Sequence, residues 1–258
     1  MIKMIITDLD NTLLRSDKSI SEYTISILKR YQEKGVIITF ATARSTQAAA
    51  RFLDQFTPDI FIGYGGAIAF AGEEIISRFD IPADISSQLI NECLQESEIS
   101  CIHAINESVA YTNRIDSSNT DSSHYSYFDF SLDSNISYLK ISLVTTDPHI
   151  VESIALNYPM LDMLRYTGEN LYKFANRNAV KWNAVKAVAK HYNIDTDMVV
   201  AFGDDKNDLE MIKNCGFGVA VENAIEEVKS AAKYICDNND NDGVAKWLDE
   251  SLRRWEFE

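Results

Sequence analysis

Short apolar segments alternate with amphipathic segments along most of this chain of 258 residues. Residues 4–7, 36–41, 198–202 and 217–221 are rich in β-branched and other apolar side chains, and several of the stretches between them repeat apolar residues at helical spacing. Such alternation is typical of a parallel sheet that is covered by helices on both faces. The sequence therefore predicts an α/β fold whose core is a doubly wound, Rossmann-like parallel sheet.

The alternation is interrupted in the middle of the chain. There the predicted strands are longer, notably residues 138–145, and Asp147 is placed to cap a following helix. A polar stretch that includes residues 116–123 is too long for an ordinary loop of a compact domain. We therefore expect an α+β insertion between two parts of the core, with the following bounds: core 1–81, insertion 82–179, core 180–258.

The charge balance limits the partners of the chain. It has 24 Lys and Arg against 39 Asp and Glu, which gives a formal net charge of −15. Nucleic acids and anionic membrane surfaces are both bound through an excess of basic residues, so we expect neither as a partner. If the substrate is itself anionic, a local positive charge is needed, and a bound metal ion is the simplest source.

The sequence also indicates the compartment. No apolar run approaches the roughly 20 residues that span a bilayer. The apolar stretch at the N-terminus is short and is followed directly by acids, so we expect no signal peptide. The cysteines are scattered without C-x-x-C spacing, so we expect them to be reduced and the protein to be cytoplasmic. They are Cys93, Cys101, Cys215 and Cys236.

Two aspartates, Asp8 and Asp10, follow the first predicted strand in the run DLDNT. Ligands of open α/β folds bind at the carboxyl ends of the strands, so both carboxylates are expected at a binding edge. The plainer alternative is a turn rich in Asp and Asn that only caps the next segment. This motif by itself leaves both interpretations open.

A second acidic run, GDDKND at residues 203–208, follows another predicted strand. Carboxylates gathered at the ends of two strands raise each other's pKa unless a cation lies among them. Hard oxygen ligands suit Mg²⁺, which binds one or two carboxylates together with waters and substrate phosphate. The alternative here is a helix N-terminus with favourably placed acids.

Two further residues fit an anionic ligand. Thr42 ends the second predicted strand, where its hydroxyl and nearby backbone N–H groups can hold phosphate oxygens. Lys181 opens a predicted helix, so its ammonium can reach the same edge of the sheet. Taken separately, each has an ordinary alternative, a capping threonine and a solvated lysine.

The motifs in their order and spacing resemble the haloacid dehalogenase superfamily, and in particular its Cof-type phosphatases with an α/β cap. The resemblance covers nearly the whole chain. It is carried by DLDNTLL (8–14), FATAR (40–44), Lys181, GDDKNDLEM (203–211), GVAVENA (218–224) and NDGVA (241–245).

The resemblance implies a role for each motif residue. Asp8 would be the nucleophile that forms an aspartyl-phosphate. Asp10 would be the general acid and base, which protonates the leaving alcohol and later deprotonates water. Thr42 and Lys181 would hold the transferring phosphoryl group, and Asn207 matches a position that contacts phosphate in similar proteins.

The resemblance also implies a metal site. Mg²⁺ would be bound by the side chains of Asp8 and Asp204 and by the backbone carbonyl of Asp10. Asp208 would orient either a water on the metal or Lys181.

Some positions depart from the usual pattern of this subgroup. Ala43 stands where Gly is common, and Gly65 stands where Asn is common. Val221 and Glu222 replace a more usual Met-Gly pair. Because all catalytic and metal positions are intact, we expect an altered substrate preference and not an inactive protein.

The same resemblance makes residues 82–179 a cap that folds over the site and selects the leaving group. Tyr111, His124, Tyr125 and Tyr127 lie in or near its polar stretch and can stack on a sugar ring. Alternatively, these aromatic residues belong to the core of the cap itself or to a surface loop.

The sequence as a whole predicts a Mg²⁺-dependent phosphatase that hydrolyses a small phosphorylated metabolite, with sugar phosphates as the leading class, and that is a monomer or homodimer. Two other functions stay open at this point. One is a sugar phosphotransferase or phosphomutase that uses the same aspartyl-phosphate, and the other is a non-catalytic sensor of phosphorylated ligands. Release of inorganic phosphate without an added acceptor separates the hydrolase from the mutase.

Overall fold

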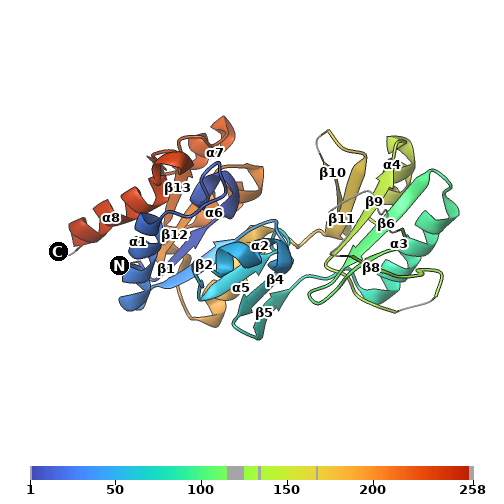
Figure 1. The fold of residues 1–258 in the computed structure, drawn as a ribbon, viewed down its shortest axis with the longest axis horizontal. Coiled ribbons are helices and arrows are strands. Elements are labelled where there is room, and N and C mark those ends of the chain that lie inside the picture. Colours follow the sequence, from blue (N-terminus) through green and yellow to red (C-terminus); the bar gives the residue numbers. More distant parts are fainter. Residues whose placement is uncertain (1, 115–124, 133–134, 167, 256–258) are drawn as a thin grey trace. The chain divides into compact units, whose positions relative to one another are not determined.

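The computed structural model describes residues 2–114, 125–132, 135–166 and 168–255. The chain divides into two compact units (Figure 1). The core unit runs to Arg78 and resumes at Val180, and the cap unit is Phe79–Ala179. The polar segment 116–123 and His124 lie outside the described residues.

The core unit contains an eight-stranded sheet in the order β14-β13-β12-β1-β2-β3-β4-β5. The six strands from β14 to β3 are parallel, and β4 and β5 add an antiparallel hairpin at one edge. The strands are β1 (Met4–Thr7), β2 (Ile37–Ala41), β3 (Ile60–Gly63), β4 (Ile68–Ala71), β5 (Glu74–Arg78), β12 (Val199–Gly203), β13 (Phe217–Val221) and β14 (Tyr234–Cys236). The predicted α/β fold with a mainly parallel core sheet is confirmed.

Helices follow most of the parallel strands. They are α1 (Glu22–Glu33), α2 (Thr46–Leu53), α5 (Lys181–His191), α6 (Leu209–Asn214), α7 (Glu226–Ala231) and α8 (Gly243–Trp255). Helix α1 packs against α8, while α5 packs against α6 and against the hairpin β4–β5. Short turns complete the unit at Leu9–Leu13, Thr196–Met198, Lys206–Asp208 and Asn239–Asn241.

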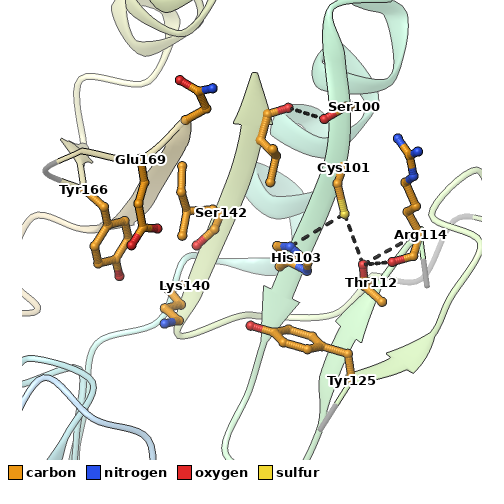
Figure 2. Close-up of a pocket in the computed structure, with 13 residues that line it drawn as sticks. Ser100, Cys101, His103, Thr112, Arg114, Tyr125, Lys140, Ser142, Tyr166 and Glu169 are labelled. Atoms are coloured by element: carbon orange, nitrogen blue, oxygen red, sulfur yellow. Dashed lines mark hydrogen bonds between the residues drawn. The ribbon is translucent and has the colours of Figure 1, made fainter. Parts of the chain in front are cut away.

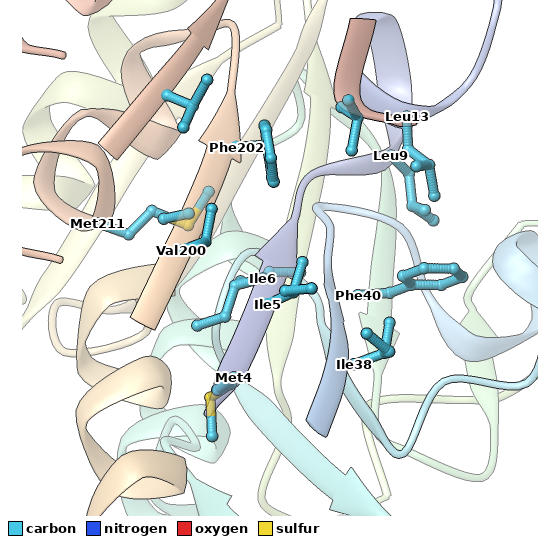
Figure 3. Close-up of a cluster of buried hydrophobic side chains, with 14 of the residues drawn as sticks. Met4, Ile5, Ile6, Leu9, Leu13, Ile38, Phe40, Val200, Phe202 and Met211 are labelled. Carbon is cyan, nitrogen blue, oxygen red and sulfur yellow. The ribbon is translucent and has the colours of Figure 1, made fainter. Parts of the chain in front are cut away.

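The central strand β1 is buried on both of its faces. Successive side chains of a strand point to opposite faces, and Met4, Ile5 and Ile6 are all fully buried. Their neighbours on either side include Phe40 of β2 and Phe202 of β12 (Figure 3). A parallel strand that is apolar on both faces needs helices on both sides, which explains why its sequence is a continuous apolar run.

Two core helices begin at serine caps, and glycine follows the end of the first. The hydroxyl of Ser21 accepts a hydrogen bond from the N–H of Thr24 at the start of α1, and Ser45 caps α2 in the same way. Gly35 follows α1 with φ +77°, a left-handed conformation that glycine adopts without strain.

The described residues of the cap unit form a six-stranded mixed sheet in the order β10-β11-β9-β6-β7-β8 and two helices. Its strands are β6 (Ile99–Ile105), β7 (Ala110–Thr112), β8 (Tyr125–Tyr127), β9 (Lys140–Thr145), β10 (Leu161–Arg165) and β11 (Leu171–Asn176). Its helices are α3 (Ala83–Gln95) and α4 (Pro148–Asn157). As predicted, Asp147 caps α4, whose first residue is Pro148.

Apolar side chains from one face of the cap sheet form a core with α3 and α4. Ile141, Leu143 and Phe174 of the sheet are fully buried in it, together with Leu89 of α3 and Val151 of α4. Residues that alternate with these on the strands point to the opposite face of the sheet. That opposite face therefore carries the polar side chains of the cap strands.

The structure separates three of the four aromatic residues of the cap that the sequence singled out; the fourth, His124, lies outside the described residues. Tyr111 belongs to the cap core, where its ring packs 5.0 Å from that of Phe128, so the plainer interpretation holds for it. The ring of Tyr125 lies 4.6 Å from that of His103, and Tyr127 is exposed.

In the part of the chain that is described, no helix is long and apolar enough to cross a membrane. All four cysteines are free and buried.

Candidate active site

The first residue of the site is Asp8, which directly follows β1. Its N–H donates a hydrogen bond to the carbonyl of Phe202 at 3.1 Å, which continues the pairing of β1 with β12. The chain then leaves the sheet in a single wide turn, where the N–H of Leu13 reaches back to the carbonyl of Asp8 at 3.3 Å. Asn11 adopts a left-handed φ of 57° within this turn, a conformation that Asn tolerates well among L-residues. The sheet thus holds Asp8 at the carboxyl edge, where the sequence placed it.

Lys181 links the two acidic motifs. Its Nζ lies 2.5 Å from Oδ1 of Asp8 and 2.7 Å from Oδ1 of Asp208. All three side chains are buried. Residues 173 positions apart in sequence thereby form one ion-paired group at the edge formed by β1 and β12.

Two glycines allow the chain to approach this group closely. A Cβ at Gly66 would lie 2.3 Å from the backbone carbon of Val180, so only glycine lets the turn after β3 pass over the start of α5. A Cβ at Gly203 would lie 2.4 Å from the Cβ of Asp208. Real Cβ contacts are never this short, so these two positions determine where Lys181 and Asp208 can lie.

Asp208 acts as an internal clamp of the GDDKND turn. Its Oδ2 accepts hydrogen bonds from the N–H groups of Asp204 (3.1 Å) and Asp205 (3.3 Å), while its Oδ1 accepts from Lys181. Both carboxylate oxygens of Asp208 are therefore already satisfied by protein donors. This arrangement orients the turn and the lysine together.

Asp8 and Asp204 accept fewer hydrogen bonds than Asp208 does among the described residues. Asp204 accepts one hydrogen bond on Oδ1, from the hydroxyl of Thr12 at 2.9 Å. Within the described residues, the second oxygen of Asp8 and that of Asp204 have no hydrogen-bond donor. One oxygen each from Asp8, Asp204 and Asp208 lie within 4.8 Å of one another. Carboxylate oxygens grouped in this way suit a hard divalent cation.

The electrostatics of the group favour a cation. Burial raises the pKa of Asp8 because it disfavours the ionised carboxylate, and Lys181 only partly offsets this. Burial likewise raises the pKa of Asp204, to about 6, although the hydrogen bond from Thr12 acts in the opposite direction. Burial alone would lower the pKa of Lys181, but the carboxylates of Asp8 and Asp208 hold it above its usual value. A bound divalent ion would favour the ionised form of Asp8 and Asp204, the two carboxylates whose pKa is raised.

Asp10 is paired with two other cationic side chains, Arg44 and Lys18, and not with Lys181. Arg44 binds it through both oxygens, with Nε to Oδ2 at 2.6 Å and Nη2 to Oδ1 at 2.7 Å, and Lys18 Nζ lies 2.9 Å from Oδ1. Although partial burial opposes ionisation, the hydrogen bonds from Arg44 and Lys18 lower the pKa of Asp10 to about 2. The Asp10 carboxylate is thus ionised and paired in this structure.

The two remaining predicted residues differ in their surroundings. Thr42 is buried at the end of β2, where its hydroxyl accepts a hydrogen bond from the N–H of Arg44 at 3.2 Å. Asn207 is exposed in the turn Lys206–Asp208, and its side chain makes no hydrogen bond to any described residue.

Sequence reasoning missed several residues that shape the site. Arg44 lies inside the segment FATAR, but spacing alone does not show which carboxylate it binds. Thr12 ends the run DLDNT, and the sequence showed only that it carries a hydroxyl, not that this hydroxyl donates to Asp204. For Lys18, whose φ of 64° marks a tight turn, the sequence carried no signal.

Two asparagines of the C-terminal part of the core, Asn223 and Asn239, hold the loop after Asp8 in place. The side-chain amide of Asn223, in GVAVENA, donates to the carbonyl of Asn11 at 2.7 Å. That of Asn239 donates to the carbonyl of Leu14 at 2.9 Å, and its N–H donates to Asn223 Oδ1 at 3.0 Å. These contacts give GVAVENA a structural role in positioning the loop after Asp8.

Two of the departures from the family pattern, Ala43 and Gly65, occupy open positions. Ala43 is exposed. Gly65 has a φ of +74°, and a Cβ built there would meet nothing within 4 Å. A side chain at position 65 would therefore point into open space.

Comparison with known proteins agrees with this geometry. A family model described as haloacid dehalogenase-like hydrolase matches residues 5–248. A Haemophilus influenzae protein, named only provisionally as a phosphatase, is 27% identical over 98% of this chain and 99% of its own length. The 5-amino-6-(5-phospho-D-ribitylamino)uracil phosphatase of Bacillus subtilis is 25% identical over 96% of both chains.

The fold has close counterparts among solved structures. A crystal structure from Thermotoga maritima superposes with a TM-score of 0.86 at 23% identity and covers 97% of both chains. Because the family model spans nearly the whole chain, the resemblance expected from the motifs is confirmed. The chain belongs to the haloacid dehalogenase-like hydrolases, as a Cof-type phosphatase with an inserted cap.

Proposed function

We propose that this protein is a Mg²⁺-dependent hydrolase of small phosphomonoesters, with sugar phosphates as its main substrates, and that it acts through an aspartyl-phosphate on Asp8. The observation that carries the proposal is the buried group in which Lys181 bridges Asp8 and Asp208, with Asp204 beside them. A buried carboxylate that keeps one free oxygen, next to a fixed ammonium, is suited to attack an anionic phosphorus centre.

In the first half of the proposed reaction, an oxygen of Asp8 attacks phosphorus and the ester P–O bond breaks. The alcohol leaves with a proton supplied by Asp10. In the second half, Asp10 takes a proton from water, the hydroxide oxygen attacks phosphorus, and the Asp8–phosphate bond breaks. Inorganic phosphate is released and both aspartates return to their starting states.

The group of charges at the site has a defined role in this scheme. Substrate phosphate is repelled by a bare carboxylate, so its charge must be neutralised before Asp8 can approach. Lys181 does this from one side. Mg²⁺, held by the side chains of Asp8 and Asp204 and the backbone carbonyl of Asp10, would supply further positive charge at the phosphoryl oxygens. Asp208 would keep Lys181 in place and orient the turn that carries Asp204.

Asp10 requires a change of partner to act as an acid. A carboxylate that is held by Arg44 and Lys18 is ionised and has no proton to give. We infer that the pair with Arg44 opens during the catalytic cycle, so that Asp10 can be protonated near the leaving group.

Thr42 and Asn207 are the proposed phosphate contacts. The hydroxyl of Thr42 still has its proton to donate, since in the described residues it acts only as an acceptor. The exposed amide of Asn207 is equally free to bind an oxygen of the phosphoryl group.

Sugar phosphates are proposed for two reasons. By its name, the relative from B. subtilis acts on a phosphorylated ribityl compound, whose leaving group is a polyol. The cap unit, proposed here to select the leaving group, offers hydroxyl and aromatic side chains on the exposed face of its sheet.

The proposal is tested by phosphate release from a panel of sugar phosphates with purified protein and Mg²⁺, without any added acceptor. Wild-type protein is expected to release inorganic phosphate, and Asp8→Asn is expected to lose at least about 10³-fold in kcat. Asp205→Asn is the matched control, because Asp205 lies in the same acidic run but is exposed and only caps a turn. Transfer of phosphorus to another sugar hydroxyl, with no free phosphate, would instead identify a mutase.

A further inference from the structure

One face of the cap sheet is covered by helices, and the other carries a pocket of about 530 Å³ (Figure 2). Its walls come from β6, β7, β8, β9 and the segment that joins β10 to β11. Residues on this face alternate with those of the cap core, as Ser142 does with the buried Ile141 and Leu143. The pocket lies entirely within the cap unit.

Two lysines lie diagonally across β9 and β11 on this face; Lys140 lines the pocket, and Lys173 lies on the same face outside the pocket lining. Lys173 of β11 is directly opposite Ser142 of β9, and Lys140 is two residues before Ser142 on the same face of β9. Both ammonium groups are half-buried, and burial lowers the pKa of both. Lys140 reaches a pKa of about 8, with the positive charge of Lys173 as a second cause.

Neither lysine has a counter-ion. Among the described residues, no carboxylate forms an ion pair or hydrogen bond with Lys140 or Lys173. Asp162 contributes to the field at Lys173, but its carboxylate is paired with Arg177 at 3.2 Å. Glu169 lines the pocket, is exposed and does not reach either ammonium.

Two neighbouring lysines without a carboxylate partner are unusual in so acidic a unit. The cap unit has five Lys and Arg against fourteen Asp and Glu, yet two of the five lie together without a carboxylate. Two half-buried like charges disfavour each other, and the cost is relieved when an anion binds between them.

A polar side chain, Ser142, is the cross-strand neighbour of Lys173 and lies two residues from Lys140 on β9. Ser142 is 4% exposed and lines the pocket, and its hydroxyl has no hydrogen bond to any described residue. Close by, Nδ1 of His103 is buried without a hydrogen-bond partner in the described structure. A buried hydroxyl and ring nitrogen that face a pocket without partners are groups that a polar ligand would satisfy.

Two rings that are tilted by 44° to each other, those of His103 and Tyr125, form an aromatic wall of the pocket. The rings of His103 and Tyr125 lie 4.6 Å apart on the side of the pocket away from Glu169 (Figure 2). Such a wall suits the carbon face of a sugar or polyol. The pocket thus combines a place for a carbohydrate chain with a place for a negative charge.

We propose that Lys140, Lys173 and Ser142 bind a second anionic group of the substrate, carried by the alcohol that the reaction releases. This inference rests on the proposed function and narrows it. The preferred substrates are phosphomonoesters of sugars or polyols that bear a carboxylate or a further phosphate.

Matched substrate pairs test the proposal by kcat/KM. The carboxylate arm compares 6-phosphogluconate with glucose 6-phosphate, and the phosphate arm compares fructose 1,6-bisphosphate with fructose 6-phosphate. We expect the wild-type protein to prefer the anionic member of at least one pair by about tenfold, the effect of one favourable charge contact. The arm that responds identifies the anion.

Variants assign that preference to the lysines. In the double variant Lys140→Gln/Lys173→Gln the preference is expected to fall to within about twofold of unity, with turnover of the neutral member retained. Lys29→Gln is the control, since Lys29 is exposed on α1 of the core unit. Equal rates on both members in the wild type, or a preference that survives the double variant, would overturn the proposal.

Direct binding separates this inference from the proposed catalysis. Gluconate is not a phosphate ester, so it probes the cap without turnover. We expect gluconate or inorganic phosphate to shift backbone amide signals of β9 and β11 in NMR spectra, and neutral glucose to leave them unchanged. No shift with either anion would contradict the anion site even if phosphatase activity is found. A shift in a protein without phosphatase activity would support the site and refute the proposed function.

Discussion

The guanidinium of Arg44 binds both carboxylate oxygens of Asp10, at 2.6 and 2.7 Å. Bidentate pairs of this kind are among the strongest ionic contacts at a protein surface. The pair holds the proposed acid and base in its ionised form, so it defines a resting arrangement of the site. In the proposed mechanism, this pair would open before Asp10 protonates the leaving group.

Arg44→Gln is expected to raise the pKa of Asp10 from about 2 toward the ordinary value of 3.8, because the main group that favours its ionised form is lost. Carbon-detected NMR titration of the Asp side chains in metal-free protein measures this shift. Since both side chains are partly exposed, the loss of folding stability is expected to be at most about 1 kcal/mol. Arg51→Gln on α2 is the control, and an unchanged titration of Asp10 would show that the pair does not form in solution.

Lys181→Met is expected to destabilise the metal-free protein by about 3 kcal/mol. The substitution leaves the carboxylates of Asp8 and Asp208 buried without a cation, and breaking a buried ion pair typically costs this much. Urea denaturation followed by circular dichroism measures the change. Lys190→Met serves as the control, because Lys190 is an exposed residue of the same helix. Adding Asp208→Asn to Lys181→Met should recover part of the loss, and a stability equal to the wild type for Lys181→Met would contradict the ion-paired group.

Stabilisation by Mg²⁺ is expected to be larger at pH 7.5 than at pH 5. Asp204 has a folded-state pKa of about 6 against the ordinary value of 3.8, so the folded metal-free protein holds a proton more tightly than the unfolded chain between these values. Stability of the metal-free protein therefore falls as pH rises through this window, and Mg²⁺ replaces the lost proton above it. Thermal unfolding with EDTA or with Mg²⁺ at both pH values measures the effect.

Asp204→Asn provides the internal control for this measurement. The variant should lose most of the Mg²⁺-dependent shift in Tm and should be inactive with or without EDTA. A shift of the same size at both pH values in the wild type would rule out Asp204 as a ligand that gains its charge in this range.

Gly203→Ala is expected to cost about 1–3 kcal/mol of stability and to impair activity, because the added methyl would lie 2.4 Å from the Cβ of Asp208. The matched substitution is Gly65→Asn, at a left-handed position with open space around it. Asn tolerates that conformation, so stability should change by no more than about 0.5 kcal/mol. Chemical denaturation and steady-state kinetics check both variants, and a fully stable, active Gly203→Ala would show that the Asp208 clamp is not required.

The local pattern of the sequence was sufficient to predict the core fold. Continuous apolar runs such as Met4–Thr7 are typical of strands that are buried on both faces, and Ser21 and Ser45 cap helix starts by accepting hydrogen bonds from nearby backbone N–H groups. The pattern did not predict α3 or most of the cap strands. Their positions depend on packing between distant segments, such as α3 against β6, which no local period encodes.

The order of the motifs likewise predicted which residues meet at the candidate site, because acids at the ends of parallel strands share one edge of the sheet. What the sequence left undecided was the choice of partners. Lys181 had two carboxylates available and binds both, while Asp10 is paired with Arg44 rather than with Lys181. Such pairings depend on differences of a few tenths of an ångström in the positions of residues that are far apart in the chain. Only tertiary packing determines these positions. The lysines of the cap are the clearest case, since Lys140 and Lys173 become neighbours only when β9 and β11 pair in one register.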